Sequence, residues 1–187
     1  MRQLLASLTL FVTTAAVSPL AGAALTAQAP TPQRGAAAVL DDPTIVAIFD
    51  AANTADVETG ELAAKRGSTK AVRDFGAMIA RDHRNVRGQG RELAKKLGVT
   101  PTPPKNDDGA REHAEAMRKL RSLHGAAFDR AFLEHEVAFH QAVIDAVNGT
   151  LLPAIQNPQL KQLVVTVAPA FAAHRDAAKR LLETEAH

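Results

Sequence analysis

An apolar stripe with helical spacing runs through residues 72–97 and limits the possible folds more than any other part of the chain. Its members are Val72, Phe75, Ile79, Val86, Leu93 and Leu97. Steps of three, four and seven residues predict one long helix with a buried face. His83 lies four residues after Ile79 and three before Val86, so its imidazole should point into the core. The helix is therefore predicted to carry a buried histidine, with Asp82 beside it.

The first 23 residues are typical of a secretory signal peptide. Arg2 precedes an apolar run over residues 4–17, and the small residues 21–23 form a cleavage site. The run is shorter than the roughly 20 residues that a membrane-spanning helix needs. We expect cleavage after Ala23, with Ala29 as the alternative, and a periplasmic protein whose mature chain has no membrane span. A retained anchor is the other interpretation.

Composition separates a tether from a single folded domain. Residues 24–40 are mainly Ala, Pro, Gln and Thr, which predicts a flexible tether. Residues 41–187 are long enough for one domain with a substantial core. The chain has no cysteine, so disulfides are excluded, and its 22 basic residues nearly balance its 20 acidic ones. No basic run is interleaved with aromatic residues, so we expect no nucleic-acid partner, only an unknown protein or envelope partner.

Capping residues predict an antiparallel pair of helices at the start of the domain. Asp42 is a candidate N-cap, Pro43 suits the first helical position, and Gly67 ends the first helix. Ser68 is the predicted cap of the second helix, which runs to Leu97. A connection of only two or three residues forces the two helices to be antiparallel neighbours.

A proline-containing segment separates this pair from the rest of the domain. Residues 99–106 include three prolines and predict a crossover. Asp107 or Asp108 should then cap a shorter helix that ends at residues 124–125. This helix is predicted to be an addition to the bundle.

Two more long helices complete the predicted fold. One should span residues 126–147 and stop at Asn148-Gly149, and the last should begin at Asn157-Pro158. Pro169 lies within the last helix and is predicted to kink it. Strand-forming patterns are scarce, so the predicted class is all-α: a four-helix bundle with an additional short crossover helix between the second and third bundle helices.

Each of the four long helices carries at least one polar side chain on its apolar face. Imidazole and carboxylate groups are the ligands that zinc, iron and copper prefer, and bundle cores are a common place to assemble them. The predicted metal ligands are Asp56, His83, Glu136, His140 and His174, and Asp82 and Asp129 are predicted to orient them. The remaining histidines, His113, His124, His135 and His187, are predicted to be surface, loop or terminal residues.

Depth along the helices tests which of these groups can meet. The positions of Asp56 and His83 along the helix axis differ by roughly 5 Å, one helical turn, so contact between them is expected. With the last turn centred near Pro153, His140 would lie roughly 12 Å along the axis from His174, unless residues 150–157 climb. Glu136 is then the better partner of His174.

Two alternatives compete with a single metal site. The buried polar groups can instead form a hydrogen-bonded network that only fixes helix register. A dinuclear ferritin-type centre needs a Glu-x-x-His pair on two helices, but Ala80 and Phe171 precede His83 and His174 by three residues. The dinuclear pattern is therefore not predicted.

Several of these residues fall in segments that resemble a bacterial family, domain of unknown function 4142. The segments are Asp56-x-x-x-Gly60-x-Leu62-Ala63, Phe75-x-x-x-Ile79-x-x-Asp82-His83, Phe128-Asp129-x-x-Phe132-Leu133 with His140, and Pro169-x-x-x-x-His174. The resemblance covers residues 42–182 and implies an exported protein of ferritin-like fold, of a kind often labelled predicted outer membrane protein. The family usually has Glu at position 56 and commonly Tyr at position 132, where this chain has Asp and Phe. Its biochemical activity is unsettled.

These observations favour a non-enzymatic cell-envelope protein with a buried His/carboxylate site for a transition metal, with no catalytic residues assigned. One alternative is a structural or partner-binding bundle in which the polar core fixes register. A third interpretation is a metal-dependent oxidase, which the missing Glu-x-x-His pairs disfavour.

Overall fold

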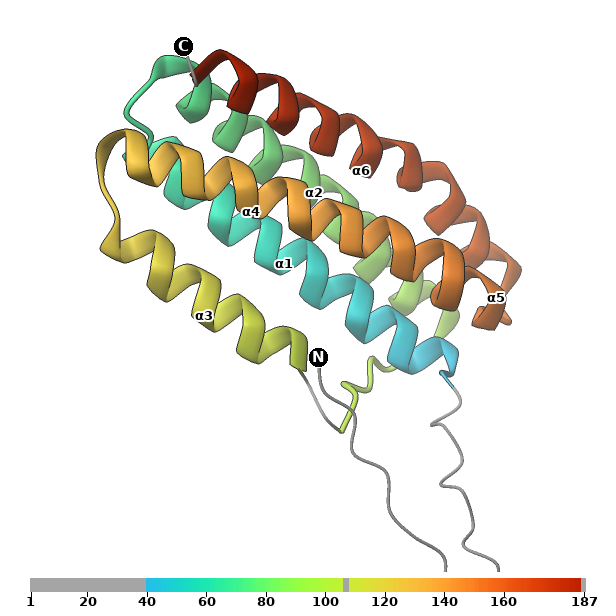
Figure 1. Cartoon of the computed structure of the whole chain (residues 1–187). Helices are drawn as coiled ribbons and strands as arrows, with labels where there is room; N and C mark the ends of the chain where they lie inside the picture. The colour runs from blue at the N-terminus through green and yellow to red at the C-terminus, as the bar shows by residue number, and fades with distance from the viewer. Residues whose placement is uncertain (1–39, 106–107, 186–187) are drawn as a thin grey trace, which may run out of the picture. The chain divides into compact units, whose positions relative to one another are not determined.

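The computed structural model describes residues 40–105 and 108–185, and all regular structure in these ranges is helical (Figure 1). The elements are α1 (Asp42–Arg66), α2 (Lys70–Leu97), α3 (Asp108–Ser122), α4 (Gly125–Ala146), the π-helix η1 (Val147–Leu151), α5 (Leu152–Ala154) and α6 (Pro158–Glu185). The predicted all-α class is confirmed, whereas a ferritin-like topology stays a prediction. The predicted signal peptide and residues 24–39 of the predicted tether lie outside the described residues.

Helices α1 and α2 form one closely packed pair, and α4 and α6 run side by side as a second pair (Figure 1). The shorter α3 lies alongside α1 and α4, as expected for a helix added to the bundle. Within the described ranges, no helix has the length and apolarity to cross a membrane.

The start of α1 differs by one residue from the prediction and ties two parts of the chain together. The N-cap is Asp41, whose Oδ1 accepts a hydrogen bond from the Thr44 amide at 2.9 Å. Asp42, the predicted cap, instead accepts bonds from the backbone amides of Gln156 and Asn157 at 2.9 and 2.8 Å. Its carboxylate therefore fastens the connection before α6 to the start of α1.

The cap of α2 is also displaced by one residue. Thr69 is the N-cap, and its hydroxyl accepts the amide of Val72 at 3.3 Å. Ser68, the predicted cap, donates its hydroxyl to Asp129 instead, at 2.6 Å. At the other end, Gly98 adopts a left-handed conformation with φ of 66° and ends the helix directly after Leu97.

The path between α4 and α6 contradicts the predicted stop at Asn148-Gly149. The chain stays helical through η1 and α5 as far as Ala154. Val147, Leu151 and Ile155 are buried in the apolar core along this stretch. Their burial outweighs the local preference of Asn and Gly for a turn, so the reversal falls near residue 156 rather than near Pro153.

Two apolar clusters fill the interior, and a polar layer lies between them. One cluster includes Ile45 and Phe49 of α1 and Leu160 and Phe171 of α6. The other includes Ala63 of the same α1 and, farther along α6, Ala178. Between them in sequence come the buried polar residues Asn53, Asp56, Thr59, His83, Glu136, His140 and His174.

Candidate metal centre

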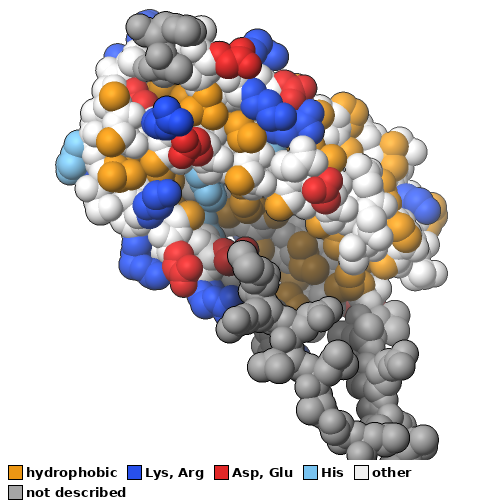
Figure 2. All heavy atoms as spheres, in the orientation of Figure 1, with side chains coloured by type: hydrophobic (Ala, Val, Ile, Leu, Met, Phe, Trp, Pro, Cys, Tyr) orange, Lys and Arg blue, Asp and Glu red, His pale blue; other side chains and the backbone are white. Residues whose placement is uncertain are grey.

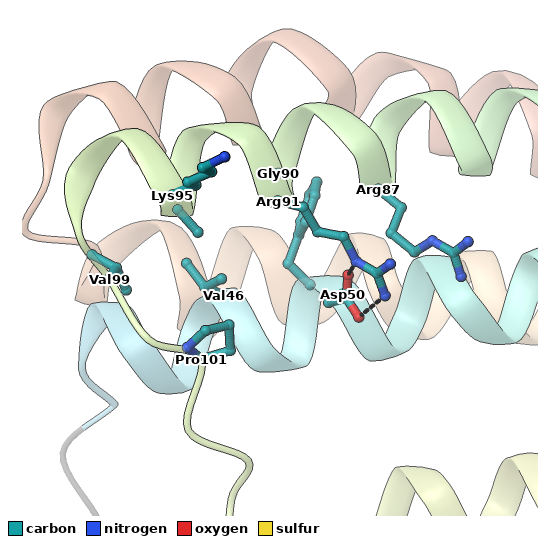
Figure 3. Close-up of a pocket in the computed structure, with 10 residues that line it drawn as sticks. Val46, Asp50, Arg87, Gly90, Arg91, Lys95, Val99 and Pro101 are labelled. Carbon is teal, nitrogen blue, oxygen red and sulfur yellow. Dashed lines mark hydrogen bonds and ion pairs between the residues drawn. The ribbon is translucent and has the colours of Figure 1, made fainter.

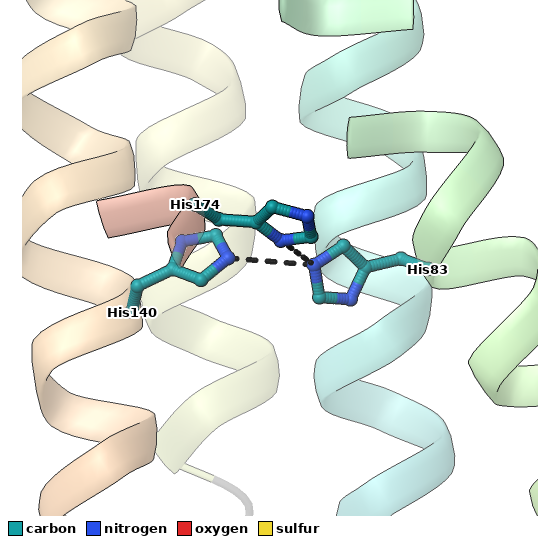
Figure 4. Close-up of side chains that lie close together, drawn as sticks. All are labelled: His83, His140 and His174. Atoms are coloured by element: carbon teal, nitrogen blue, oxygen red, sulfur yellow. Dashed lines mark hydrogen bonds between the residues drawn. The ribbon is translucent and has the colours of Figure 1, made fainter. Parts of the chain in front are cut away.

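Three histidine side chains from three helices meet in the polar layer (Figure 4). His83 comes from α2, His140 from α4 and His174 from α6. Their exposed fractions are only 1%, 0% and 6%. The Nε2 atom of His83 lies 3.2 Å from Nδ1 of His174 and 3.3 Å from Nε2 of His140. One nitrogen of each ring therefore faces a common point, and we call these residues the three-histidine group.

The outer nitrogen of His83 faces two oxygen atoms of α1. Nδ1 lies 2.9 Å from Oδ1 of Asn53 and 3.3 Å from Oδ2 of Asp56. The Asn53 amide nitrogen donates to the Phe49 carbonyl at 2.8 Å, which turns the amide oxygen toward the ring. The proton of neutral His83 therefore belongs on Nδ1, and Nε2 presents a lone pair to the centre of the group.

The other two rings are held in the same way. Nδ1 of His140 donates to the backbone carbonyl of Glu136 at 3.0 Å, and that carbonyl can only accept. Nε2 of His174 donates to Oδ2 of Asp82 at 3.3 Å. The remaining nitrogens, Nε2 of His140 and Nδ1 of His174, are then unprotonated and point inward (Figure 4).

This arrangement brings three lone pairs together with no proton between them. The atoms that face one another at 3.2 and 3.3 Å are all acceptors in these tautomers. Nitrogens bound tetrahedrally to one zinc ion at about 2.0–2.1 Å lie about 3.3 Å apart, so the spacing fits a shared ion. A proton donated outward to oxygen is also the usual support of a metal-binding histidine.

Burial keeps these rings neutral. It lowers the pKa of His83 to about 3, and the neighbouring His140 and His174 rings lower it further by repulsion. Burial likewise lowers the pKa of His140 to about 3, and it lowers that of His174. Because metal ions bind the neutral ring, all three side chains are in the binding-competent form at neutral pH.

Two buried carboxyl groups lie on the outer side of the group. The Glu136 Oε2 atom is 3.4 Å from Nδ1 of His140, and Thr59 donates its hydroxyl to Oε1 at 2.9 Å. Burial raises the pKa of Glu136 to about 8. Burial raises the pKa of Asp56 as well, and repulsion by Glu136 adds to this shift. Both groups therefore favour the protonated form when no cation is nearby.

The structure brings together all five predicted ligand residues, Asp56, His83, Glu136, His140 and His174, but in two groups. The ligand atoms of the three histidines lie within 4.8 Å of one another, as do those of Asp56, Glu136 and His140. The expectation that His140 lies far from His174 is wrong, because their ring centroids are 5.4 Å apart. With the reversal near residue 156, His140 falls close to the depth of His174.

The two predicted orienting residues differ in position. Asp82 contacts His174, as expected, and also pairs with Arg81 at 2.8 Å. Asp129, predicted to orient a ligand, instead accepts the backbone amides of Ser68 and Thr69 at 2.8 and 3.0 Å. Its carboxylate holds the turn between α1 and α2 rather than a histidine ring.

Sequence reasoning missed Asn53 and Thr59 as hydrogen-bond partners of the buried ligands. Asn53 lies three residues before Asp56 and Thr59 three after it, so all three share one side of α1. Recurrence at steps of three was the signal available for both. Two small polar residues on an apolar face indicate partners for buried ligands.

Two of the histidines predicted for the surface are partly buried. His113 of α3 pairs through Nε2 with Glu58 of α1 at 2.8 Å. Burial lowers the pKa of His135 to about 4, and repulsion by His113 and Lys119 adds to the effect. Both are covered because α3 packs on α1 and α4. His124 is exposed as predicted, and His187 lies outside the described residues.

A separate surface pocket of about 380 Å³ lies between α1, α2 and the segment after α2 (Figure 3). Its lining includes the apolar residues Val46 and Phe49 and the basic residues Arg87, Arg91 and Lys95. Arg91 pairs with Asp50 across the pocket, with Nη2 and Oδ2 2.8 Å apart. No histidine lines this pocket, so it is distinct from the three-histidine group.

Comparisons with known proteins place the chain in a family. Neither the comparison with curated proteins nor the one with solved structures gave a match. The family model described as Domain of unknown function (DUF4142) matches residues 26–181, which is most of the chain. The chain therefore belongs to the DUF4142 family.

Proposed function

We propose that this protein is an exported envelope protein that binds one transition-metal ion through His83, His140 and His174. One observation carries the proposal: the three imidazoles each direct one ring nitrogen to a common point, at spacings of 3.2 and 3.3 Å. Without a cation, three lone pairs repel one another there. A metal ion relieves this repulsion and satisfies all three rings at once.

The donor set favours zinc, copper or iron over hard ions. Neutral imidazole suits these metals, whereas calcium and magnesium prefer oxygen. Three protein nitrogens leave a fourth position for another ligand of a tetrahedral ion. In this proposal Asp56, Glu136 and Asp82 hold the rings from outside, so Asp56 and Glu136 are not ligands of this ion, as they were predicted to be.

We propose a binding role rather than catalysis. The three rings are at most 6% exposed and come from three helices, so the site is enclosed within the bundle. Such a site suits retention of an ion more than turnover of a substrate. Export rests on the signal-peptide pattern of residues 1–23.

Elemental analysis tests the proposed ion. Protein purified without chelators, then offered zinc and dialysed, should retain about one ion per chain. The double variant His83→Ala/His174→Ala should retain less than a tenth of that amount. His124→Ala is the matched control, because His124 is an exposed histidine outside the group, and it should bind metal as the wild type does.

Two results would contradict the proposal. Equal retention by the double variant would leave only a register role for the polar core, provided that circular dichroism shows both proteins to be folded. Turnover of ferrous iron with oxygen would instead indicate an oxidase. The single variant His174→Gln, altered at the most exposed of the three rings, serves if the double variant does not fold.

A further inference from the structure

Two buried oxygen atoms beside the three-histidine group have no hydrogen-bond partner. They are Oδ1 of Asp56 and Oε2 of Glu136, on side chains that are 2% and 0% exposed. The other oxygen of each carboxyl group is occupied: Oδ2 of Asp56 faces His83, and Oε1 of Glu136 accepts from Thr59. Buried polar atoms are rarely left unpaired, so these two require a ligand.

No basic side chain supplies the missing partner. Among the ion pairs of the described residues, Asp56 contacts only His83 and Glu136 contacts only His140. The Nδ1 protons of both rings are already used: that of His83 goes to the side-chain oxygen of Asn53, and that of His140 goes to the backbone carbonyl of Glu136. Two carboxylates in a dry interior with no lysine or arginine are strongly destabilised unless a cation or protons neutralise them.

The donor atoms lie close enough for one cation. One carboxylate oxygen of Asp56 and one of Glu136 lie within 4.8 Å of each other. Mg²⁺ holds oxygen ligands at about 2.0–2.1 Å, so two donors on opposite sides of a hard divalent ion of similar size are about 4.0–4.2 Å apart. A side-chain shift of less than about 1 Å would close the site.

We propose that Asp56 and Glu136 form a second cation site, made of carboxylate oxygens, which takes a hard divalent ion such as Mn²⁺. This site lies at the Nδ1 edge of His140, whereas the three-histidine group uses the Nε2 edge of the same ring. Oxygen donors prefer harder ions than imidazole does, so the two sites select different metals. The second site does not require the first to be filled.

Manganese binding to zinc-treated protein tests the proposal. Zinc is first added to fill the three-histidine group and its content is measured, and Mn²⁺ is then titrated while electron paramagnetic resonance follows the free ion. Wild-type protein should remove about one Mn²⁺ per chain from solution without releasing zinc. Glu136→Gln and Asp56→Asn keep the side-chain shape and should each weaken Mn²⁺ binding at least tenfold.

Glu134→Gln is the matched control, because Glu134 is an exposed residue of the same helix as Glu136 and pairs with Arg130 outside both sites. It should bind Mn²⁺ as the wild type does. The proposal is overturned if the wild type leaves the Mn²⁺ signal unchanged, if Glu136→Gln binds equally well, or if Mn²⁺ displaces zinc. Failure of the three-histidine site would instead appear as missing zinc before any Mn²⁺ is added, so the two proposals fail separately.

Discussion

At the scale of residues, the polar layer is a set of histidines that are each backed by an oxygen acceptor. The sequence allowed His83, His140 and His174 to be found because each interrupts an apolar stripe at helical spacing. The acceptors were harder to find, because Asn53 accepts from His83 of a neighbouring helix and this contact depends on the tertiary arrangement. Asp129 also lies on the buried face of its helix, but its carboxylate accepts a hydrogen bond from the turn between α1 and α2. Periodicity alone cannot distinguish this contact from a role beside a metal ligand.

Glu136 should make the stability of the metal-free protein depend on pH. Folding raises its pKa from 4.5 to about 8, so the folded state holds the proton more tightly. Stability from this group is fully present below pH 4.5 and is lost as the pH rises toward 8. The glutamine side chain of Glu136→Gln stays neutral at every pH. The free energy of unfolding of this variant should therefore rise relative to that of the wild type by up to about 1.4 kcal/mol per pH unit across this interval.

Urea unfolding of both proteins at several pH values, with a chelator present, measures this difference. Glu134→Gln is the control, because Glu134 is an exposed residue of the same helix, paired with Arg130. Its unfolding free energy should track that of the wild type at every pH. Parallel curves for Glu136→Gln and the wild type would show that Glu136 ionises normally in the folded protein.

At the scale of elements, the sequence predicted the helices themselves better than it predicted where each helix ends and which residues of neighbouring helices lie at the same level along the bundle. The predicted caps of α1 and α2 were each one position away from the observed ones, because the neighbouring residue in both cases, Asp or Thr, is also a favourable N-cap. The larger error was at Asn148-Gly149, where buried Val147 and Leu151 keep the chain helical. That single extension decides which residue of α4 meets His174.

Close packing of α1 on α2 depends on two glycines that face each other. A Cβ at Gly76 would lie 2.7 Å from both the Gly60 carbonyl oxygen and the Ala63 Cβ. Gly76→Ala should therefore push the helices apart and lower the free energy of unfolding by about 1–3 kcal/mol. Gly88→Ala is the control on the same helix, because a Cβ there meets nothing within 4 Å.

We expect Gly88→Ala to raise the free energy of unfolding by about 0.5–1 kcal/mol through helix propensity alone. Chemical denaturation of the two variants and the wild type measures both changes. A stabilising Gly76→Ala would mean that the helices are farther apart than the structure shows.

At the scale of the whole molecule, a polar layer separates two apolar clusters. Residues such as Ile45 and Leu160 fill one cluster, and Ile79 and Phe128 fill the other. A fully apolar interior would be the simpler way to stabilise such a bundle, because buried ionisable groups rarely add net stability. A bound ligand therefore best explains why four helices direct polar side chains into this layer. The all-α fold could be predicted from helical periodicity and caps alone, without knowledge of a ligand.

Histidine tautomers test this explanation most directly. Nitrogen-15 NMR of metal-free, histidine-labelled protein should show the proton on Nδ1 of His83 and His140 and on Nε2 of His174. One equivalent of Zn²⁺ should then shift the unprotonated nitrogen of each ring and leave the exposed His124 unchanged. The account would be contradicted by a proton on any inward-facing nitrogen. It would also be contradicted if Zn²⁺ left the nitrogen-15 signals of all three rings unchanged.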